Sequence, residues 1–172
     1  MNALRVIRDA RAEDCPSIYP FFSAIVAAGE TYAYPEDLSS EPAGEYWIAP
    51  PPGRTVVAVD GTSAVLGSAS MGPNRPGRGS HIVTASFMVD PRRQGRGVGR
   101  ALGRHVIERA RASGDRGIRF NAVVETNAPA VHLWRSLGFE VTGTVPRAFR
   151  HARHGYVGLA VMFLDLAAAR AR

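Results

Sequence analysis

The stretch that decides the fold runs from residue 89 to residue 102 and reads VDPRRQGRGVGRAL. An apolar strand ends at Val89, a glycine-rich turn follows, and the turn opens onto a segment whose apolar residues have helical spacing. Gly95, Gly97 and Gly99 can adopt positive φ angles without a Cβ clash, so their N–H groups can join those of the helix start in one concavity that favours an anion. The arginines around this turn are Arg92, Arg93, Arg96 and Arg100. We therefore predict a binding site for a phosphate or pyrophosphate.

Three known glycine-rich motifs are alternatives to a phosphate-binding turn of this kind. A Walker loop needs a lysine before Ser or Thr, and the chain contains no lysine. The dinucleotide fingerprint G-x-G-x-x-G requires Gly or Ala at its sixth position, where this chain has Arg100. Arginine- and glycine-rich tails that bind nucleic acid are disordered, whereas this stretch lies between an apolar strand and an apolar helix face. A phosphate-binding turn of another kind remains.

Length and composition bound the class of protein. A chain of 172 residues, 45% of them hydrophobic, is expected to form one compact domain, 1–172. It has no apolar run of about 18 residues, and Met1–Arg5 lacks the apolar core of a signal peptide, so we expect a cytoplasmic protein without a membrane partner. The single cysteine, Cys15, excludes an internal disulfide and a cysteine-cluster zinc site. His151 and His154 have the spacing of metal ligands but no third partner, so no metal is predicted.

Hydrophobic periodicity predicts strands and helices around the turn. Strands are expected at residues 4–8, 54–60, 63–71, 81–89, 118–124, 140–145 and 156–164. Helices are expected at residues 14–29, 39–48, 100–113 and 129–138, with Pro20 kinking the first or shifting its start. The strands before and after helix 100–113 should lie parallel, as a strand–helix–strand unit. The basic segment 147–154 is expected to be a loop between the last two strands.

A second motif follows the strand at residues 118–124. Residues 127–139 read NAPAVHLWRSLGF, in which Pro129 suits a helix start and Gly138 a helix end. The two motifs resemble motifs A and B of the GNAT superfamily, the acyl-CoA-dependent N-acyltransferases. The residues that carry the resemblance are Gln94, Gly97, Gly99, Asn127, Ala130, Leu133, Gly138 and Phe139. Their order along the chain, with the expected elements between them, supports the resemblance over a chance match.

The resemblance implies an α+β fold with acetyl-CoA as co-substrate. Its central mixed sheet is mostly antiparallel, contains one parallel strand pair that splays apart, and is flanked by about four helices. Acetyl-CoA would lie in the gap between the splayed strands, and a backbone N–H near Met88 and Val89 would stabilise the charge that develops on the acyl oxygen. The residues implied for cofactor binding are Phe87, Met88, Val89, Gln94, Gly95, Arg96, Gly97, Val98, Gly99, Arg100, Asn127 and Trp134.

The reaction implied by the resemblance is acetyl transfer to the amine of a small molecule, such as an amino acid or imino acid. In this family the connection between the first two helices borders the acceptor site. That connection carries two tyrosines in this chain. The substrate-side candidates are Glu30, Tyr32, Tyr34 and, on the strand 81–89, Thr84.

The sequence departs from the family pattern at the residue that commonly protonates the leaving thiolate. Trp134 holds this position, and its indole N–H donates a hydrogen bond but does not give up its proton. The residues 120–124, FNAVV, followed by Asn127 and by Leu133 and Trp134, resemble the branch of fungal acetyltransferases for proline analogues. That resemblance makes Asn121 and Asn127 the catalytic candidates. A solvent-facing or edge position in an alternating strand explains Asn121 equally well.

Other classes of function stay open at this point. The missing tyrosine leaves room for a domain that binds acyl-CoA without transferring the acyl group, and an acetyltransferase of proteins is a further alternative. The net charge of +6 is carried by arginine. This charge alone motivates a nucleic-acid-binding protein as a third class. The sequence predicts no nucleic-acid partner, because basic and aromatic residues do not interleave in an RNA-binding motif. The sequence leaves open whether the chain acts as a homodimer.

Overall fold

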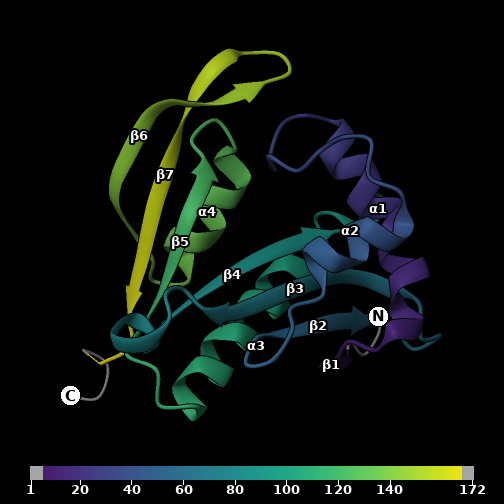
Figure 1. Ribbon diagram of the computed structural model, residues 1–172, viewed down its shortest axis with the longest axis horizontal. Coiled ribbons are helices and arrows are strands. Elements are labelled where there is room, and N and C mark those ends of the chain that lie inside the picture. Colours follow the sequence, from purple (N-terminus) through teal and green to yellow (C-terminus); the bar gives the residue numbers. More distant parts are fainter. Residues whose placement is uncertain (1–5, 168–172) are drawn as a thin grey trace.

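The computed structural model describes residues 6–167, which form one seven-stranded mixed sheet with α-helices on both faces (Figure 1). The strands are β1 (Val6–Asp9), β2 (Arg54–Val59), β3 (Val65–Pro73), β4 (Ile82–Val89), β5 (Gly117–Val124), β6 (Glu140–His151) and β7 (Gly155–Asp165). The α-helices are α1 (Cys15–Ala27), α2 (Ser40–Trp47), α3 (Val98–Ala112) and α4 (Ala128–Ser136), with short 3₁₀ helices at η1 (Ala12–Asp14), η2 (Gly77–Gly79) and η3 (Pro91–Arg93). The strand order is β1-β2-β3-β4-β5-β7-β6. The predicted fold class is confirmed.

The central strands β4 and β5 are parallel, whereas the other neighbouring strands of the sheet are antiparallel. This confirms the predicted strand–helix–strand unit around α3. β4 and β5 pair only through Ile82 with Gly117 and Val83 with Ile118. Beyond these pairs the two strands diverge, as Figure 1 shows. The later half of β4 therefore has one edge that no described strand covers.

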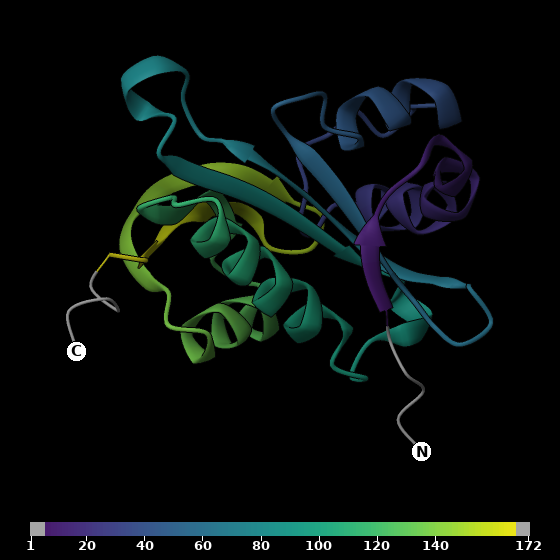
Figure 2. The same cartoon turned by 90° about the horizontal axis from the view of Figure 1, so that it is seen from below.

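The helices cover the two faces of the sheet in pairs (Figure 2). α3 and α4 bury one face, and the core there contains Leu102 and Trp134. α1 and α2 bury the other face, and the core there contains Phe22 and Trp47. Because side chains alternate along a strand, successive residues of β4 enter different cores.

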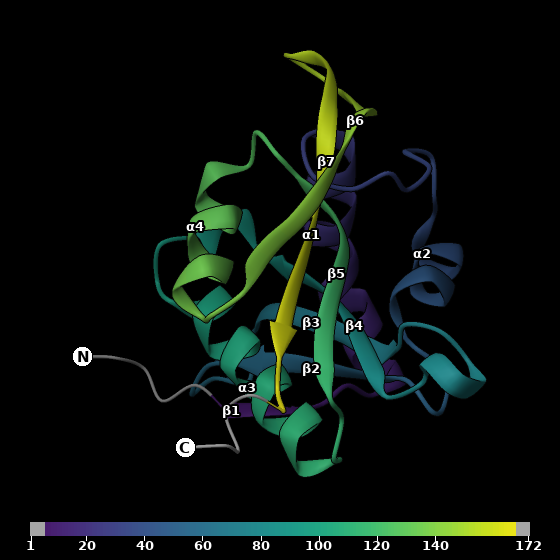
Figure 3. The ribbon, with the colours of Figure 1, turned by 90° about the vertical axis from the view of Figure 1, so that its left-hand side faces the viewer.

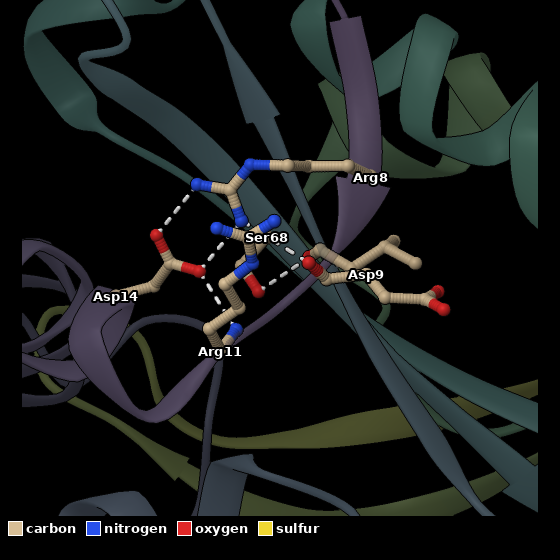
Figure 4. Close-up of polar contacts among 6 residues, drawn as sticks. Arg8, Asp9, Arg11, Asp14 and Ser68 are labelled. Atoms are coloured by element: carbon tan, nitrogen blue, oxygen red, sulfur yellow. Dashed lines mark hydrogen bonds and ion pairs between the residues drawn. The ribbon is translucent and has the colours of Figure 1, made fainter.

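A charged contact fixes the start of α1 against β1 (Figure 4). Arg8 on β1 donates from both terminal nitrogens to the Asp14 carboxylate, each at 2.8 Å, and the Arg11 N–H donates to it at 2.7 Å. The hydrogen bonds from Arg8 hold the pKa of the Asp14 carboxyl below its usual value. α1 begins at Cys15 and continues past Pro20 to Ala27.

The hairpin of β6 and β7 extends beyond the rest of the sheet (Figure 3). The prediction of a loop at residues 147–154 is wrong, because β6 continues to His151. A register shift in β6, with Arg147 at a φ of 53°, lets this polar segment remain in a strand. At the hairpin tip the Ala152 N–H donates to the Gly29 carbonyl at 2.9 Å. The hairpin tip thus contacts the segment that follows α1.

The remaining elements lie within a few residues of their predicted positions. β1 begins at Val6, and Leu4, which is predicted in this strand, lies outside the described residues. β3 continues to Pro73, into a segment that is predicted as a loop. Of the helices within residues 6–167, none combines the length and the apolar character that crossing a membrane requires.

Gly67 permits the close approach of β3 to β4, which yields a test of the central packing. A Cβ at Gly67 would lie 2.8 Å from the Met88 carbonyl oxygen and 3.2 Å from the Val89 Cα. These are backbone atoms and cannot move without shifting β4. We expect Gly67→Ala to lower the free energy of unfolding by about 2 kcal/mol in urea denaturation. Gly61→Ala is the control, because a Cβ there has no neighbour within 4 Å. Equal stability of the two variants would contradict this packing.

Candidate active site

The edge of β4 that faces the gap carries backbone groups without a strand partner. The even-numbered residues of β4 pair with β3: the Asp90 N–H donates to the Leu66 carbonyl at 3.0 Å, and the register places Met88 opposite Ser68. Bonded residues alternate in an antiparallel ladder, so the odd-numbered peptide groups point toward the gap. Beyond the pairs with β5, these residues are Ala85, Phe87 and Val89. Met88, a predicted cofactor residue, therefore directs its peptide group to β3 and its side chain into the core under α1 and α2.

The turn after β4 presents the N–H groups that the sequence predicts. Gly95 and Gly97 both have a φ of 73°, and Gly97 is the N-cap of α3. The Ala101 N–H donates to the Gly97 carbonyl at 3.0 Å in the first turn of α3. The N–H groups of residues 98–100 precede this bond and have no helical acceptor. A Cβ at Gly99 would lie 3.3 Å from a side chain of α4, so this glycine keeps the two helices close. The turn fits a phosphate group.

The arginines around the turn are not equivalent. Arg92 donates through Nη2 to the buried Asp90 carboxylate at 2.8 Å, and this hydrogen bond holds the pKa of Asp90 below its usual value. Asp90 therefore neutralises the charge of Arg92. Arg100 donates through Nη2 to the Ser136 hydroxyl at 2.9 Å, which links the start of α3 to the end of α4. Arg96 is exposed beside the glycines. The positive charge that faces an anion comes from fewer arginines than the sequence suggests.

Aromatic side chains form the wall of the gap on the face of α3 and α4. Trp134 on α4 packs against both strands, with its ring centroid 4.5 Å from that of Phe87 on β4 and 4.8 Å from that of Phe120 on β5. Val98 is buried in the same core, so only its backbone can contact a ligand at the turn. Asn127 is the N-cap of α4 and accepts the Ala130 N–H through Oδ1 at 3.2 Å. This bond leaves the Asn127 side-chain N–H groups as donors.

Polar side chains lie on the opposite face, toward α1 and α2. Asn121 on β5 donates through Nδ2 to Asn74 Oδ1 at 2.6 Å and to Thr84 Oγ1 at 3.3 Å. Thr84 belongs to β4 and Asn74 follows β3, so one carboxamide spans the gap. Asn121 is exposed, as the alternation of the strand predicts, and it faces the gap rather than open solvent alone. The sequence analysis missed Asn74, which lies in a segment rich in glycine and proline that gives no signal of a site.

Both predicted tyrosines lie against β4. The Tyr32 hydroxyl accepts the Phe87 N–H at 2.9 Å and donates to the Phe87 carbonyl at 2.6 Å. Tyr34 stacks on Tyr32 with ring centroids 5.4 Å apart and on Phe22 at 5.5 Å. Burial raises the pKa of both hydroxyls above the usual value. Both side chains therefore remain neutral at physiological pH and cannot serve as anionic bases.

Glu30 connects the acceptor side to the hairpin. Its carboxylate forms an ion pair with Arg153 at the tip of the β6–β7 hairpin. The backbone contact between Ala152 and Gly29 lies beside this pair. The sequence does not indicate that Arg153 pairs with Glu30, because the two residues belong to distant segments. The predicted contact of Glu30 with a substrate stays a prediction.

The residues considered as metal ligands or as a nucleophile have other contacts. In the part of the chain that the structure describes, no three His, Cys, Asp or Glu residues are grouped to hold a metal ion. The rings of His151 and His154 lie 4.6 Å apart, but His151 Nδ1 accepts the Arg153 N–H at 3.1 Å. Cys15 lies at the start of α1 against Gly44 of α2. The residues described at the gap offer hydrogen-bond donors and acceptors.

Known proteins share both the sequence pattern and the fold. A sequence model described as the acetyltransferase (GNAT) family matches residues 8–139. The L-methionine sulfoximine/L-methionine sulfone acetyltransferase of Pseudomonas aeruginosa is 36% identical over 146 residues, which cover 82% of this chain and 83% of that protein.

Solved structures extend this likeness to the whole sheet. A GCN5-related N-acetyltransferase from Kribbella flavida superposes with a TM-score of 0.91 at 57% identity, covering 94% of this chain and 98% of that one. A phosphinothricin acetyltransferase from Sinorhizobium meliloti, solved in complex with AcCoA, superposes with a TM-score of 0.84 at 27% identity, covering 96% of this chain and 89% of that one.

The turn can be tested with a matched pair of glycine variants. Gly97 and Gly114 stand at opposite ends of α3, with φ angles of 73° and 82°. Valine at either position should cost similar stability, on the order of 1–2 kcal/mol, because the left-handed conformation is strained for a residue with a Cβ. Only Gly97→Val places a side chain at the predicted phosphate position. We expect it to weaken acetyl-CoA binding at least tenfold in calorimetry, roughly 1.4 kcal/mol or more, whereas Gly114→Val binds normally. Normal affinity in Gly97→Val would show that the phosphate site lies elsewhere.

Proposed function

Because this chain belongs to the acetyltransferase (GNAT) family, we propose that it transfers the acetyl group of acetyl-CoA to the amine of a small molecule, such as an amino acid or imino acid. The observation that carries the proposal is the uncovered edge of β4, which leads directly into the phosphate-binding turn at residues 95–100. The complex of the Sinorhizobium meliloti relative with AcCoA supports the choice of co-substrate. Acetyl-CoA supplies the acetyl group as a thioester whose carbonyl carbon an amine can attack.

The residues present fit this co-substrate along its length. The free N–H groups of residues 98–100 would hold the pyrophosphate at the start of α3. The peptide groups of Val89 face the gap, so they can pair with the amide-containing arm in the way that a sheet edge pairs with an added strand. Those of Phe87 also face the gap but are bonded to the Tyr32 hydroxyl. Asn127 retains free side-chain donors beside the start of α4.

The chemistry requires a neutral amine close to the thioester. The amine nitrogen forms a bond to the carbonyl carbon, the carbon–sulfur bond breaks, and the bonding electron pair leaves with the sulfur. The proton that the amine loses passes to water, and the thiolate takes a proton from water. An N–H on the β4 edge stabilises the negative charge that develops on the acyl oxygen. We assign this donor to the odd-numbered residues Phe87 and Val89, because Met88 faces β3.

Asn121 is positioned to orient the amine. Its side-chain Nδ2 donates to Asn74 and Thr84. Its side-chain oxygen, Oδ1, has no hydrogen-bond donor among the residues that the structure describes. This oxygen can accept an N–H from an amine that enters from the face of α1 and α2. Holding two reactants in an attacking geometry can contribute on the order of 7–11 kcal/mol to a barrier. Positioning is therefore the main contribution of this chain. The acetyl group passes directly from acetyl-CoA to the amine in a ternary complex.

A small acceptor suits the acceptor side better than a protein does. The hairpin tip contacts the segment after α1 through Ala152 with Gly29 and Arg153 with Glu30. These contacts hold the hairpin tip against the segment that carries the tyrosines, so the hairpin bounds the acceptor side. The name of the Pseudomonas aeruginosa relative gives two methionine derivatives as acceptors, which also favours an amino acid.

The second candidate is an acyl-CoA-binding domain without transferase activity. Trp134 favours it, since this side chain is buried among aromatic rings and cannot return a proton to sulfur. Such a domain would bind acetyl-CoA at the same turn and release no CoA thiol when amines are added. A screen of acceptors distinguishes the two candidates.

An acceptor screen tests the proposed reaction. We expect CoA thiol release from acetyl-CoA to increase when amino acids or imino acids are present, because the site holds a small neutral amine beside the thioester. Peptides with free N-termini or lysine side chains serve as the comparison and should be acetylated far more slowly. Binding of acetyl-CoA without thiol release for any amine would support the second candidate, and preferred acetylation of peptides would contradict the small acceptor.

Two substitutions test the division of roles at the gap. Asn121→Ala should lower kcat at least about tenfold, or roughly 1.4 kcal/mol of transition-state stabilisation, while acetyl-CoA affinity changes little, because Asn121 contacts the acceptor side. Trp134→Phe should retain substantial activity, because the role of this ring is packing. Initial rates and calorimetry on both variants give the comparison. The assignment fails if Asn121→Ala is kinetically silent, or if Trp134→Phe folds and binds acetyl-CoA normally without turnover.

A further inference from the structure

Tyr32 occupies a peptide group on the edge of β4 that acetyl transfer needs. Its hydroxyl uses both the N–H and the carbonyl of Phe87, at 2.9 Å and 2.6 Å. Counted from the phosphate-binding turn, Val89 is the first residue whose peptide group faces the gap, and Phe87 is the second. An arm that runs inward from the turn along this edge therefore brings its thioester end to Phe87.

One N–H cannot serve two acceptors well. A backbone residue offers a single donor, and sharing it lengthens and weakens both hydrogen bonds. If the acyl oxygen takes the Phe87 N–H, the Tyr32 hydroxyl has to give it up. The Tyr32 side chain is largely surrounded by aromatic rings, with Tyr34 stacked at 5.4 Å and Trp47 edge-on at 6.1 Å.

The segment that carries Tyr32 is held at both ends by hydrogen bonds that do not involve β4. Gly29 accepts the Ala152 N–H at the hairpin tip, and the Leu38 carbonyl accepts the Tyr19 hydroxyl at 3.0 Å. Tyr32 lies between these two anchors, so its side chain can leave Phe87 while both anchors hold. Such an arrangement permits a local change without movement of α1 or α2.

We propose that the Tyr32 hydroxyl competes with the acyl oxygen of acetyl-CoA for the Phe87 N–H, and that acetyl-CoA displaces it on binding. This inference rests on the proposed function. Tyr32 is thus a positioning residue that opposes acetyl-CoA binding, and its release changes the wall against which the acceptor amine lies. The sign of its effect distinguishes it from a structural residue, because loss of structural support would weaken binding whereas loss of a competitor strengthens it.

The first test measures the affinity of Tyr32→Phe for acetyl-CoA by calorimetry. Removing the hydroxyl frees the Phe87 N–H, so we expect binding about fivefold tighter than in the wild type, the equivalent of one net hydrogen bond. Tyr19→Phe is the matched control, since its hydroxyl also bonds a backbone carbonyl of the same segment but does not touch β4. It should leave the affinity unchanged. Equal or weaker binding by a folded Tyr32→Phe variant would overturn the inference.

The second test keeps Tyr32 intact and follows its neighbour. Trp47 and Trp134 are the two tryptophans of the chain, so Trp134→Phe leaves Trp47 as the only indole fluorophore. Displacement of the Tyr32 ring should change Trp47 emission as acetyl-CoA is titrated into this variant, with the same midpoint that calorimetry on the variant gives.

Unchanged Trp47 emission at saturating acetyl-CoA would overturn the displacement of Tyr32, even if Tyr32→Phe fails to fold. A wild-type protein that binds no acetyl-CoA would overturn the proposed function as well. Transfer activity without either response would overturn this inference alone.

Discussion

The site depends on a parallel strand pair that ends after two residue pairs. Packing on both sides holds the strands apart beyond that point. On one side Trp134 packs against both Phe87 and Phe120, whose rings also meet edge to face. On the far edge of β5, the Glu125 N–H donates to the Gly158 carbonyl at 3.0 Å, and the Glu125 carboxylate accepts the Gly158 N–H, so β5 stays with β7 where it leaves β4. The packing of β5 therefore keeps the edge of β4 uncovered, and a ligand can form hydrogen bonds with the backbone groups on that edge.

The gap separates two kinds of surface. The face of α3 and α4 offers aromatic rings and the backbone donors of the turn, whereas the face of α1 and α2 offers the polar groups around Asn121. Backbone donors at a helix start are already ordered, so they bind an anion without the loss of side-chain entropy that an arginine would bring. In the proposed reaction the two substrates approach from these opposite faces and meet at the β4 edge. The ion pair between the buried Asp90 and the exposed Arg92 stabilises the structure of the turn and adds no net charge to it.

Local signals made the turn and most elements predictable from the sequence. Glycine spacing indicated the left-handed backbone at residues 95 and 97, and the cap at Asn127 agrees with the predicted start of α4. Features that arise from register could not be predicted. Asn74 meets Asn121, and Arg153 meets Glu30, only because the sheet brings distant segments together. The bulge at Arg147 also explains why the sequence predicts a loop at residues 147–151, since a residue with positive φ interrupts the alternation that marks a strand.

The most direct test of the account is residue-resolved hydrogen exchange of the backbone amides from 82 to 104, with and without acetyl-CoA. If the co-substrate completes the pairing of β4, the amides of Val89 and of residues 98–100 should exchange at least about tenfold more slowly in its presence, roughly 1.4 kcal/mol of added protection. The Met88 amide already faces β3 and should change little. Saturating acetyl-CoA that leaves Val89 and residues 98–100 unprotected, while other segments gain protection, would contradict the placement of the site in this gap.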